Sequence, residues 1–276
     1  MPRKALAASK LRDRLLVEPG SRVRLAGRDP AATHGWTKET AVAKVAADLE
    51  RLTAVQERLW AERKQRVLVI LQGIDAAGKD GTIKHVMTAF NPQGTPVTAF
   101  GVPSAAEVAH DYLWRVHAAT PRRGEIAIFN RSHYEDVLIV RVHELVAKAT
   151  WSRRYAQIND FERMLSEEGT TIVKFFLLID RDTQRERLQA RYDDPTKRWK
   201  FNMADLAERA RWDEYIAAFE DALTRCSTAV APWYIVPANR KWFRDLAVGE
   251  ILADVLEGLH PQYPTRDDLP TGVVVT

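Results

Sequence analysis

Cysteine and long apolar stretches are both scarce in this sequence of 276 residues. The single cysteine, Cys226, excludes an intramolecular disulfide and any metal site built from several cysteines, a composition typical of a reducing compartment. The best uninterrupted apolar runs, 67–71 and 175–179, are far shorter than the roughly 18 residues that a membrane-spanning helix needs. We therefore expect no membrane contact, and we interpret both runs as buried strands.

We also expect no secretory signal at the N-terminus. The first residues are basic, but they include the acidic Asp13, and no long apolar stretch with a small-residue cleavage site follows them. We therefore expect a cytoplasmic protein.

Positive charge is concentrated in the first part of the chain, although the whole sequence has a net charge of only +4. Residues 1–30 contain eight basic and three acidic side chains, a balance of +5, which leaves −1 for the other 246 residues. The body of the protein is therefore not basic, and we expect no specific nucleic-acid binding. The basic arm, 1–35, is either a solvated tail or a segment that touches a polyanion or a neighbouring subunit.

Apolar strands alternate with helical patterns along the rest of the chain. Such βα units predict an α/β fold with a parallel five-stranded sheet, helices on both faces, and ligands at the carboxyl ends of the strands. We expect one domain, 36–260, followed by a C-terminal tail, 261–276. The predicted strands are 67–71, 97–100, 126–129, 172–179 and 233–236. The predicted helices are 37–65, 82–90, 105–119, 151–168, one that ends near 191, one that starts near 202, and 242–259.

A glycine-rich turn, GIDAAGKD, follows the first strand and precedes a helix, which is the context that a phosphate-binding loop requires. Its backbone N–H groups and Lys79 would converge on a phosphate. Asp80 replaces the usual Ser or Thr after the lysine, so we expect magnesium to be held by Asp75 and by acidic residues after the third strand. A glycine-rich turn with an exposed lysine is the alternative. The candidate loop residues are Gly73, Ala76, Ala77, Gly78, Asp80 and Gly81.

Polar residues 130–136, NRSHYED, follow the third strand, where a Walker B carboxylate is expected. Asn130 stands nearest the strand, and Glu135 and Asp136 come five and six residues later. Arg131 is a candidate for neutralising phosphate charge, since a guanidinium binds phosphate oxygens through two parallel hydrogen bonds. An ordinary ion pair between Arg131 and Glu135 on one helix turn is the alternative. The candidate metal ligands are Asp75, Glu135 and Asp136.

The stretch DDPTKRWK interrupts the helical pattern and predicts a surface lid at about 183–205. A basic lid that closes over a phosphate loop would deliver positive charge and exclude water, both of which favour phosphoryl transfer. A solvated basic face is the alternative. The candidate cations for polyphosphate are Lys84, Arg187, Arg191, Lys197, Arg198 and Lys200.

Several long motifs in register resemble the family-2 polyphosphate kinases. GIDAAGKDGTIKHV is similar to the Walker A segment of that family, FNRSHYEDVLIVRVH to its Walker B segment, and DPTKRWKF to its lid. NPQG, RWDEY and APWYIVPANRKWF are similar to its other conserved segments, so the resemblance extends over about 36–259.

The resemblance implies a thymidylate-kinase-like P-loop fold of three layers with a helical lid, a homodimer or homotetramer, and dependence on Mg²⁺, with Mn²⁺ as the alternative ion. It implies that Asp75 and Lys79 are catalytic and that Arg131 and the lid cations hold polyphosphate. Residues 130–135, NRSHYE, are similar to the class III subgroup, which phosphorylates both AMP and ADP.

We therefore expect transfer of the terminal phosphoryl group of inorganic polyphosphate to AMP or ADP. Catalysis would depend on Asp75, Lys79, Arg131 and Glu135 through alignment and charge neutralisation, because the acceptor oxygen is already anionic. Glu135 would act on the metal or in selecting the acceptor. The alternatives are an ATP-dependent nucleotide kinase of the thymidylate-kinase type and a non-catalytic polyanion-binding protein.

Overall fold

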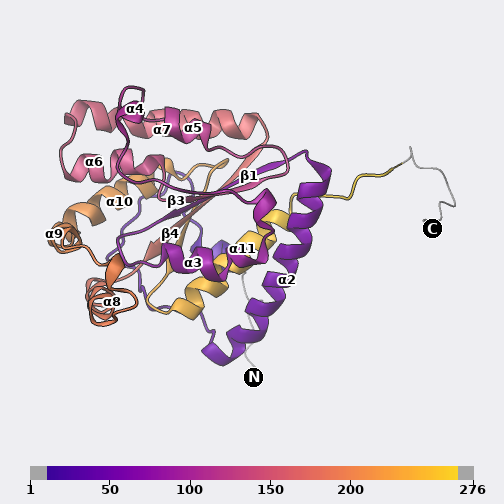
Figure 1. The fold of residues 1–276 in the computed structure, drawn as a ribbon, viewed down its shortest axis with the longest axis horizontal. Coiled ribbons are helices and arrows are strands. Elements are labelled where there is room, and N and C mark those ends of the chain that lie inside the picture. Colours follow the sequence, from indigo (N-terminus) through magenta and orange to yellow (C-terminus); the bar gives the residue numbers. More distant parts are fainter. Residues whose placement is uncertain (1–10, 267–276) are drawn as a thin grey trace, which may run out of the picture.

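A parallel sheet of five strands organises the part of the chain that the computed structural model describes, residues 11–266 (Figure 1). The strands lie in the order β2-β3-β1-β4-β5, and every neighbouring pair is parallel. The predicted α/β fold and the five predicted strands are confirmed. The strands are β1 (Arg66–Gln72), β2 (Val97–Ala99), β3 (Ile126–Asn130), β4 (Thr170–Leu178) and β5 (Trp233–Pro237).

Helices cover both faces of the sheet because the strands are apolar on both sides. In β1, Val69 and Leu71 belong to the core under α2 and α11, whereas Leu68 and Ile70 belong to the core under α7 and α10. The helices are α1 (Leu11–Leu15), α2 (Lys38–Glu62), α3 (Lys79–His85), α4 (Ala105–Val108), α5 (Trp114–Ala118), α6 (Ile139–Val142), α7 (Lys148–Glu167), α8 (Arg181–Asp193), α9 (Ala204–Ala210), α10 (Trp212–Cys226) and α11 (Lys241–Glu257). Short 3-10 turns are η1 (Met87–Ala89), η2 (Pro92–Gly94), η3 (His133–Val137) and η4 (Arg198–Lys200).

Two predicted helices are each divided in the structure. The segment 105–119 forms α4 and α5, because the Asp111 side chain accepts a hydrogen bond from the Leu113 backbone N–H (2.9 Å) and supports a turn between them. The helix predicted to start near 202 forms α9 and α10. Its break is at Arg211, which lies outside helical geometry with ψ at +21° and donates from its guanidinium to the Val142 carbonyl. A local side-chain contact therefore decided the first boundary, and a tertiary contact decided the second.

The described part of the basic arm, residues 11–35, packs against the domain, which corrects the expectation of a solvated tail for these residues. Leu11 and Leu15 are buried in the core beside α11, and the backbone N–H of Val17 donates to the Trp233 carbonyl of β5 (2.8 Å). Val23 is buried as well. Residues 1–10 of the arm and 267–276 of the predicted tail lie outside the described residues.

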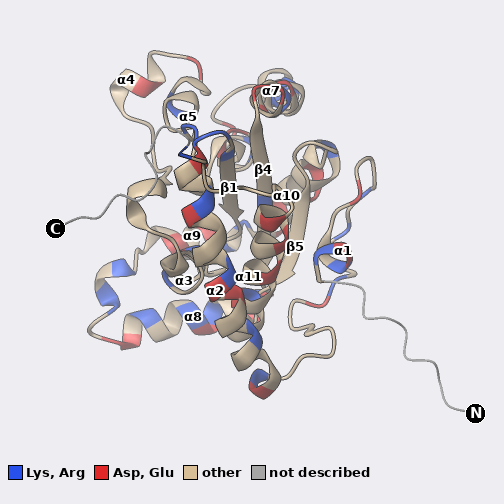
Figure 2. Ribbon diagram, turned by 90° about the vertical axis from the view of Figure 1, so that its right-hand side faces the viewer, with Lys and Arg blue, Asp and Glu red and all other residues tan. Residues whose placement is uncertain are grey.

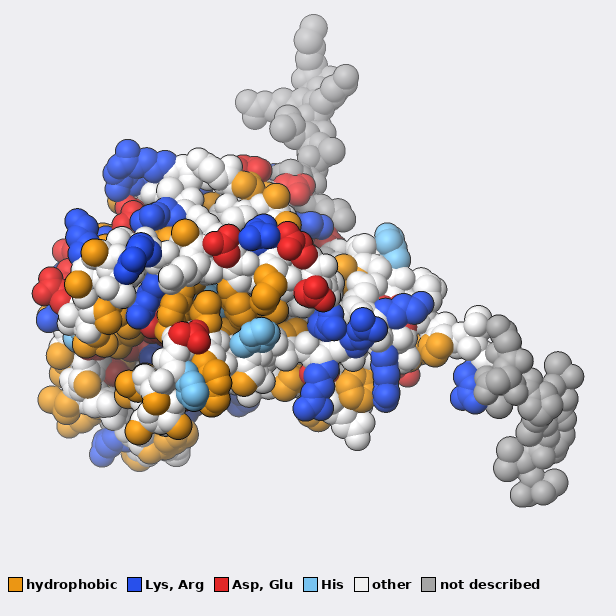
Figure 3. Space-filling view, turned by 90° about the horizontal axis from the view of Figure 1, so that it is seen from above, with side chains coloured by type: hydrophobic (Ala, Val, Ile, Leu, Met, Phe, Trp, Pro, Cys, Tyr) orange, Lys and Arg blue, Asp and Glu red, His pale blue; other side chains and the backbone are white. Residues whose placement is uncertain are grey.

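The carboxyl ends of β1, β3, β4 and β5 open toward one edge of the domain, because parallel strands all end on the same side. Basic residues recur along α8, which follows β4 at this edge (Figure 2). Viewed from above, by contrast, the molecule presents acidic, basic and hydrophobic side chains together (Figure 3). The charged side chains of the protein are therefore grouped in local clusters. We expect a polyanion site at the edge where the strands end.

Candidate active site

The glycine-rich turn between β1 and α3 forms a loop with unusual backbone angles. Gly73 and Gly78 have φ values of +156° and +113°, and Ala76 also has a positive φ of +66°. A Cβ on Gly78 would overlap the guanidinium of Arg244, and a Cβ on Gly73 would lie 2.9 Å from the Leu177 carbonyl oxygen. Glycine is therefore required at both positions by the backbone conformation and by close neighbours.

Lys79 is the first residue of α3, and its side chain is 8% exposed, so the alternative of an exposed lysine is wrong. Its ammonium donates to the Gly73 carbonyl at 2.7 Å, which keeps it folded over the loop. Burial lowers the pKa of Lys79, although Asp75 opposes that shift. The lysine is therefore a buried cation whose donors point toward the space that a bound phosphate would occupy.

Asp75 and Arg131 connect the loop to the end of β3. The Arg131 guanidinium donates to Asp75 Oδ1 at 2.7 Å. Arg131 is therefore paired with Asp75, and not with Glu135 as the alternative proposed. Burial alone would raise the pKa of Asp75, but Lys79 and Arg131 lower it below the usual value. Asp75 is therefore an ionised carboxylate between two cations.

Asp80 and Asn130 form a second link between the loop and β3. The Asn130 amide donates to Asp80 Oδ1 at 2.9 Å, and the Lys200 ammonium lies 3.7 Å from the other carboxylate oxygen. Burial alone would raise the pKa of Asp80, but the hydrogen bond from Asn130 and the charge of Lys200 lower it. An amide at the strand end can donate to this carboxylate, whereas an ionised Asp at the same position would repel it.

The two acidic residues of η3 differ in their surroundings. Burial raises the pKa of Glu135, although Arg131 and Lys79 oppose the shift, so Glu135 lies within the electrostatic reach of both candidate cations. Asp136 instead accepts a hydrogen bond from Arg154 of α7 at 2.8 Å, and neither Glu135 nor Asp136 lines the cavity described below. Its position corrects the prediction that it holds the metal together with Asp75.

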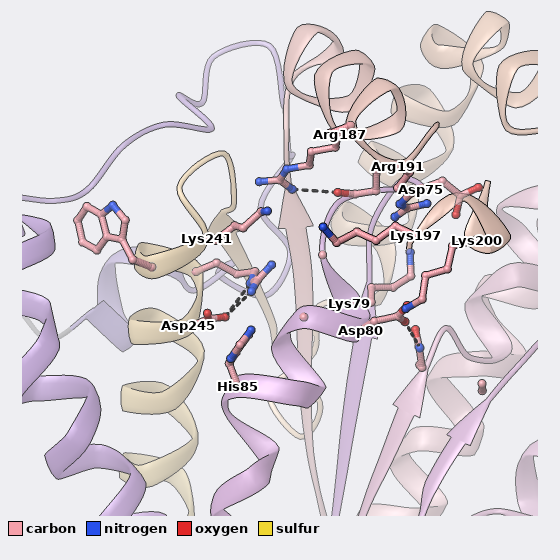
Figure 4. Close-up of a pocket in the computed structure, with 18 of the residues that line it drawn as sticks. Asp75, Lys79, Asp80, His85, Arg187, Arg191, Lys197, Lys200, Lys241 and Asp245 are labelled. Carbon is pink, nitrogen blue, oxygen red and sulfur yellow. Dashed lines mark hydrogen bonds and ion pairs between the residues drawn. The ribbon is translucent and has the colours of Figure 1, made fainter. Parts of the chain in front are cut away.

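The lid cations also separate into two groups. Arg191, Lys197 and Lys200 line the cavity (Figure 4). Arg198 is turned away, because its Nε donates to the Tyr192 carbonyl at 2.8 Å and its guanidinium lies over the Tyr192 ring. Lys84, on α3, is exposed and does not line the cavity. The structure thus does not bring Arg198 and Lys84 to the site where the other predicted cations meet.

Arg187 serves a different purpose from the one predicted for it. Its guanidinium donates to four backbone carbonyls, two in the phosphate loop and two after β5. The distances are 2.9 Å to Ala76, 3.0 Å to Ala77, 2.6 Å to Ala238 and 3.1 Å to Asn239. Burial lowers its pKa to about 10, and Arg244 adds to that effect. Arg187 lines the cavity, but its donors tie the lid helix to the loop and to the start of α11.

The start of α11 contributes residues that the sequence analysis did not select. Arg244 is 2% exposed, lies against Gly78 and Gly81, and donates to the Asp245 carboxylate at 2.6 and 2.8 Å. Lys241 lines the same cavity (Figure 4). These residues follow β5 directly, so the rule that ligands lie at the carboxyl ends of parallel strands was the signal that could have found them.

Most of these groups open into one cavity of about 1310 Å³, whereas Lys84, Glu135, Asp136 and Arg198 do not line it. Within residues 11–266, no three His, Cys, Asp or Glu side chains are grouped closely enough to hold a metal ion by themselves. Four carboxylates, Asp75, Asp80, Asp205 and Asp245, nevertheless line the cavity, and carboxylate oxygens are ligands that hard divalent cations prefer. The remaining lining includes Asn130, Arg131, Phe100, Trp199, Trp242 and His85.

Comparison with known proteins decides the family. The family model described as Polyphosphate kinase 2 (PPK2) matches residues 36–264. The chain belongs to the polyphosphate kinase 2 family. The predicted family and its class of activity, a phosphotransferase, are therefore confirmed.

Relatives with high identity support the assignment of this chain to polyphosphate kinase 2. The AMP/ADP-polyphosphate phosphotransferase of Meiothermus ruber is 51% identical over 261 residues, which cover 94% of this chain and 98% of that protein. The ADP-polyphosphate phosphotransferase of Rhodopseudomonas palustris is 46% identical over 228 residues, or 78% of this chain and 79% of that protein. The crystal structure of polyphosphate kinase 2 from Arthrobacter aurescens TC1 superimposes with a TM-score of 0.90 at 48% identity, covering 94% of this chain and 93% of that one.

The comparisons also bear on the predicted fold and cofactor. The similarity to a solved polyphosphate kinase 2 confirms the P-loop kinase fold with its three layers. Phosphotransferases of this kind use a divalent metal ion. No helix in residues 11–266 has the length and apolar character needed to cross a membrane.

Proposed function

We propose that this protein transfers the terminal phosphoryl group of inorganic polyphosphate to AMP or ADP with Mg²⁺ bound, and that Mn²⁺ can replace it. The observation that carries the proposal is the meeting of the phosphate loop, the Asp75–Arg131 pair and the lid cations in one cavity. Two polyanions can be held close together only where cations and backbone N–H groups surround them. The names of the relatives supply the two substrate classes.

The transfer requires little acid–base chemistry, because the attacking phosphate oxygen of the nucleotide is already anionic. Lys79 and the N–H groups of the phosphate loop bind oxygens of the transferring phosphoryl group, and Arg131 neutralises the charge that develops on it. Asp75 holds the Arg131 guanidinium in place at 2.7 Å. Arg191, Lys197 and Lys200 bind the polyphosphate donor and exclude water when the lid closes.

Mg²⁺ fits the donor set of the cavity, since it is usually bound by one or two carboxylates together with substrate phosphates. We assign Asp75 as the protein ligand. Glu135 does not line the cavity, so its role on the metal or in selecting the acceptor stays a prediction. When bound, the ion neutralises charge on the transferring and leaving oxygens.

We also propose that the acceptor includes AMP as well as ADP. The segment 130–135 reads NRSHYE, and the relative from Meiothermus ruber, named for both acceptors, is 51% identical. The predicted homodimer or homotetramer and the cytoplasmic location stay predictions.

The proposal is tested by incubating purified protein with a magnesium salt, AMP or ADP, and polyphosphate without ATP, followed by nucleotide analysis. We expect ADP and ATP to form. Conversion that requires ATP as the donor would identify a nucleotide kinase instead, and salt-dependent binding of polyphosphate without conversion would identify a binding protein.

The variant Lys79→Met tests the phosphate loop itself. We expect kcat to fall by about 10³-fold or more, because the buried cation at the transferring phosphoryl group is lost. Lys64→Met, which removes an exposed lysine before β1, is the matched control and should keep its activity. Near-normal turnover of Lys79→Met with an unchanged melting temperature would remove the phosphate loop from the mechanism.

A further inference from the structure

A buried ion pair lies beneath the segment that carries Arg131. Lys174 of β4 and Glu162 of α7 are both fully buried, and their side chains are 2.5 Å apart. The Lys174 ammonium also donates to the Tyr134 hydroxyl at 2.7 Å and to the Cys226 carbonyl at 2.7 Å, so all three of its donors are used. Burial alone would raise the pKa of Glu162, but the charge of Lys174 lowers it. Burial lowers the pKa of Lys174, and the charge of Glu162 opposes that shift.

Such a pair is not explained by stability alone. Well-packed apolar residues of similar volume are often as stabilising as a buried ion pair, because desolvating two charges is costly. The sheet around Lys174 is otherwise apolar, since its neighbours on β4, Val173 and Phe175, are buried hydrophobic residues. The segment that the pair fixes in place must therefore explain its presence.

The pair holds the two residues that begin η3. The Tyr134 hydroxyl donates to Glu162 Oε1 at 2.9 Å, and His133 Nε2 lies 3.2 Å from the same oxygen. Both side chains are buried. Ser132 Oγ in turn accepts the Tyr134 backbone N–H at 3.2 Å. The start of η3 is thus fixed to the core through the Glu162 carboxylate.

Arg131 stands directly before this fixed segment in a strained conformation. Its φ is +63°, a value that residues with a Cβ seldom adopt and that persists only where the surrounding structure enforces it. On one side, the Arg131 backbone N–H donates to the Leu71 carbonyl at 3.0 Å. On the other side, the chain is fixed through His133 and Tyr134. Together these contacts aim the guanidinium at Asp75 and the phosphate loop.

We propose that the Lys174–Glu162 pair is a positioning device that acts through Tyr134 and His133 to hold Arg131 in the orientation needed for phosphoryl transfer. This inference rests on the proposed function, because it requires Arg131 to act on the transferring phosphoryl group. Neither Lys174 nor Glu162 lines the cavity, so neither touches a substrate there. Their effect is expected on kcat through the geometry of one guanidinium.

The test is a double-mutant cycle between Tyr134→Phe and Arg131→Ala, with kcat and KM for polyphosphate measured for each protein. Tyr134→Phe removes one hydroxyl oxygen and should lower kcat by about 10- to 100-fold, because small displacements of a charge-neutralising group are costly. In the Arg131→Ala background, the same change should alter kcat by less than about twofold, since the group that it positions is gone. KM should change little in either background.

A control separates positioning from general loss of stability. Val173→Ala removes buried volume from the next residue of β4, whose side chain faces the other core, and should change kcat by the same factor in both backgrounds. Thermal unfolding is recorded for every variant. Should Tyr134→Phe fail to fold, the double variant Lys174→Met with Glu162→Gln, which removes both charges together, takes its place in the cycle.

The outcomes distinguish this inference from the proposed function. Equal losses of kcat from Tyr134→Phe in both backgrounds, or no loss in either, would overturn the positioning role while leaving Arg131 in the mechanism. If Arg131→Ala by itself kept kcat within about twofold, the role assigned to Arg131 in phosphoryl transfer would fail first, and the positioning role with it. If Tyr134→Phe lowers kcat in the wild-type background but not in the Arg131→Ala background, the result supports both the positioning role and the role of Arg131 in phosphoryl transfer.

Discussion

Replacing Arg187 by Met should loosen the lid, the phosphate loop and α11 from one another. The guanidinium donates to four backbone carbonyls at 2.6 to 3.1 Å, and these belong to two segments far apart in the sequence. Met keeps most of the apolar stem of the side chain but removes every donor. The four carbonyl groups would then need other partners or water.

The expected loss follows from the number and kind of these hydrogen bonds. A hydrogen bond to a charged group contributes about 1.5–3 kcal/mol, but four that share one guanidinium are not additive, and water can reach part of the site. We therefore expect the free energy of unfolding to fall by about 3 kcal/mol. For a chain of this size, that corresponds to a decrease in Tm of roughly 5–10 °C.

The assay is urea-induced unfolding followed by tryptophan fluorescence, with thermal unfolding as a second probe. Arg185→Met is the matched control, because it removes the same charge from the same helix at a side chain that is 64% exposed and whose ion pair with Asp182 is long at 3.5 Å. We expect that control to change stability by less than about 1 kcal/mol. Equal unfolding free energies for Arg187→Met and Arg185→Met would refute the assignment of Arg187 as a clamp.

Two further predictions concern the loop and η3. Gly78→Ala should abolish activity and lower Tm, because φ at Gly78 is +113° and the new Cβ would overlap Arg244. Gly27→Ala is the control, since a Cβ at Gly27 meets no atom within 4 Å. Normal activity of Gly78→Ala would contradict the loop geometry. Burial raises the pKa of Asp136 to about 6, although the charge of Arg154 opposes this shift. The Asp136 carboxyl therefore binds its proton more tightly in the folded chain than in the unfolded chain. The unfolding free energy of the wild type minus that of Asp136→Asn should therefore fall as pH rises from about 4 to 6, and a difference that rises over this range would show that Arg154 outweighs burial.

The sequence analysis identified the parts of the fold that depend on local pattern. The apolar run at the start of β1 and the three- and four-residue spacing of α2 predicted those elements to within a few residues. The break between α4 and α5 depends on a local turn at Asp111 that was missed, whereas the break between α9 and α10 depends on a contact between distant segments. Arg211, for example, ends α9 while its guanidinium reaches the Val142 carbonyl. Nothing in the local sequence around Arg211 encodes that partner.

The candidate site was predictable where motif and strand end coincide. Lys79, Asp75 and Arg131 follow β1 and β3, and the structure brings them together in one cluster. Asp136 and Arg198 were selected for their charge and their proximity in sequence to functional residues. The structure turns both of them toward other partners, Arg154 and Tyr192. Charge in the right segment does not fix the direction in which a side chain points.

By itself, the sequence determined the order of strands and helices, the phosphate loop and the family, because these are written in short-range periodicity and in contiguous motifs. Only the tertiary structure decided that Arg187 joins the loop to the lid, that Arg244 lies against Gly78, and that Lys174 supports the segment after Arg131. Each of these contacts joins segments separated by at least 40 residues, as the 40 residues between Tyr134 and Lys174 illustrate. Their partners are selected by the packing of the sheet and its helices, which no local pattern specifies.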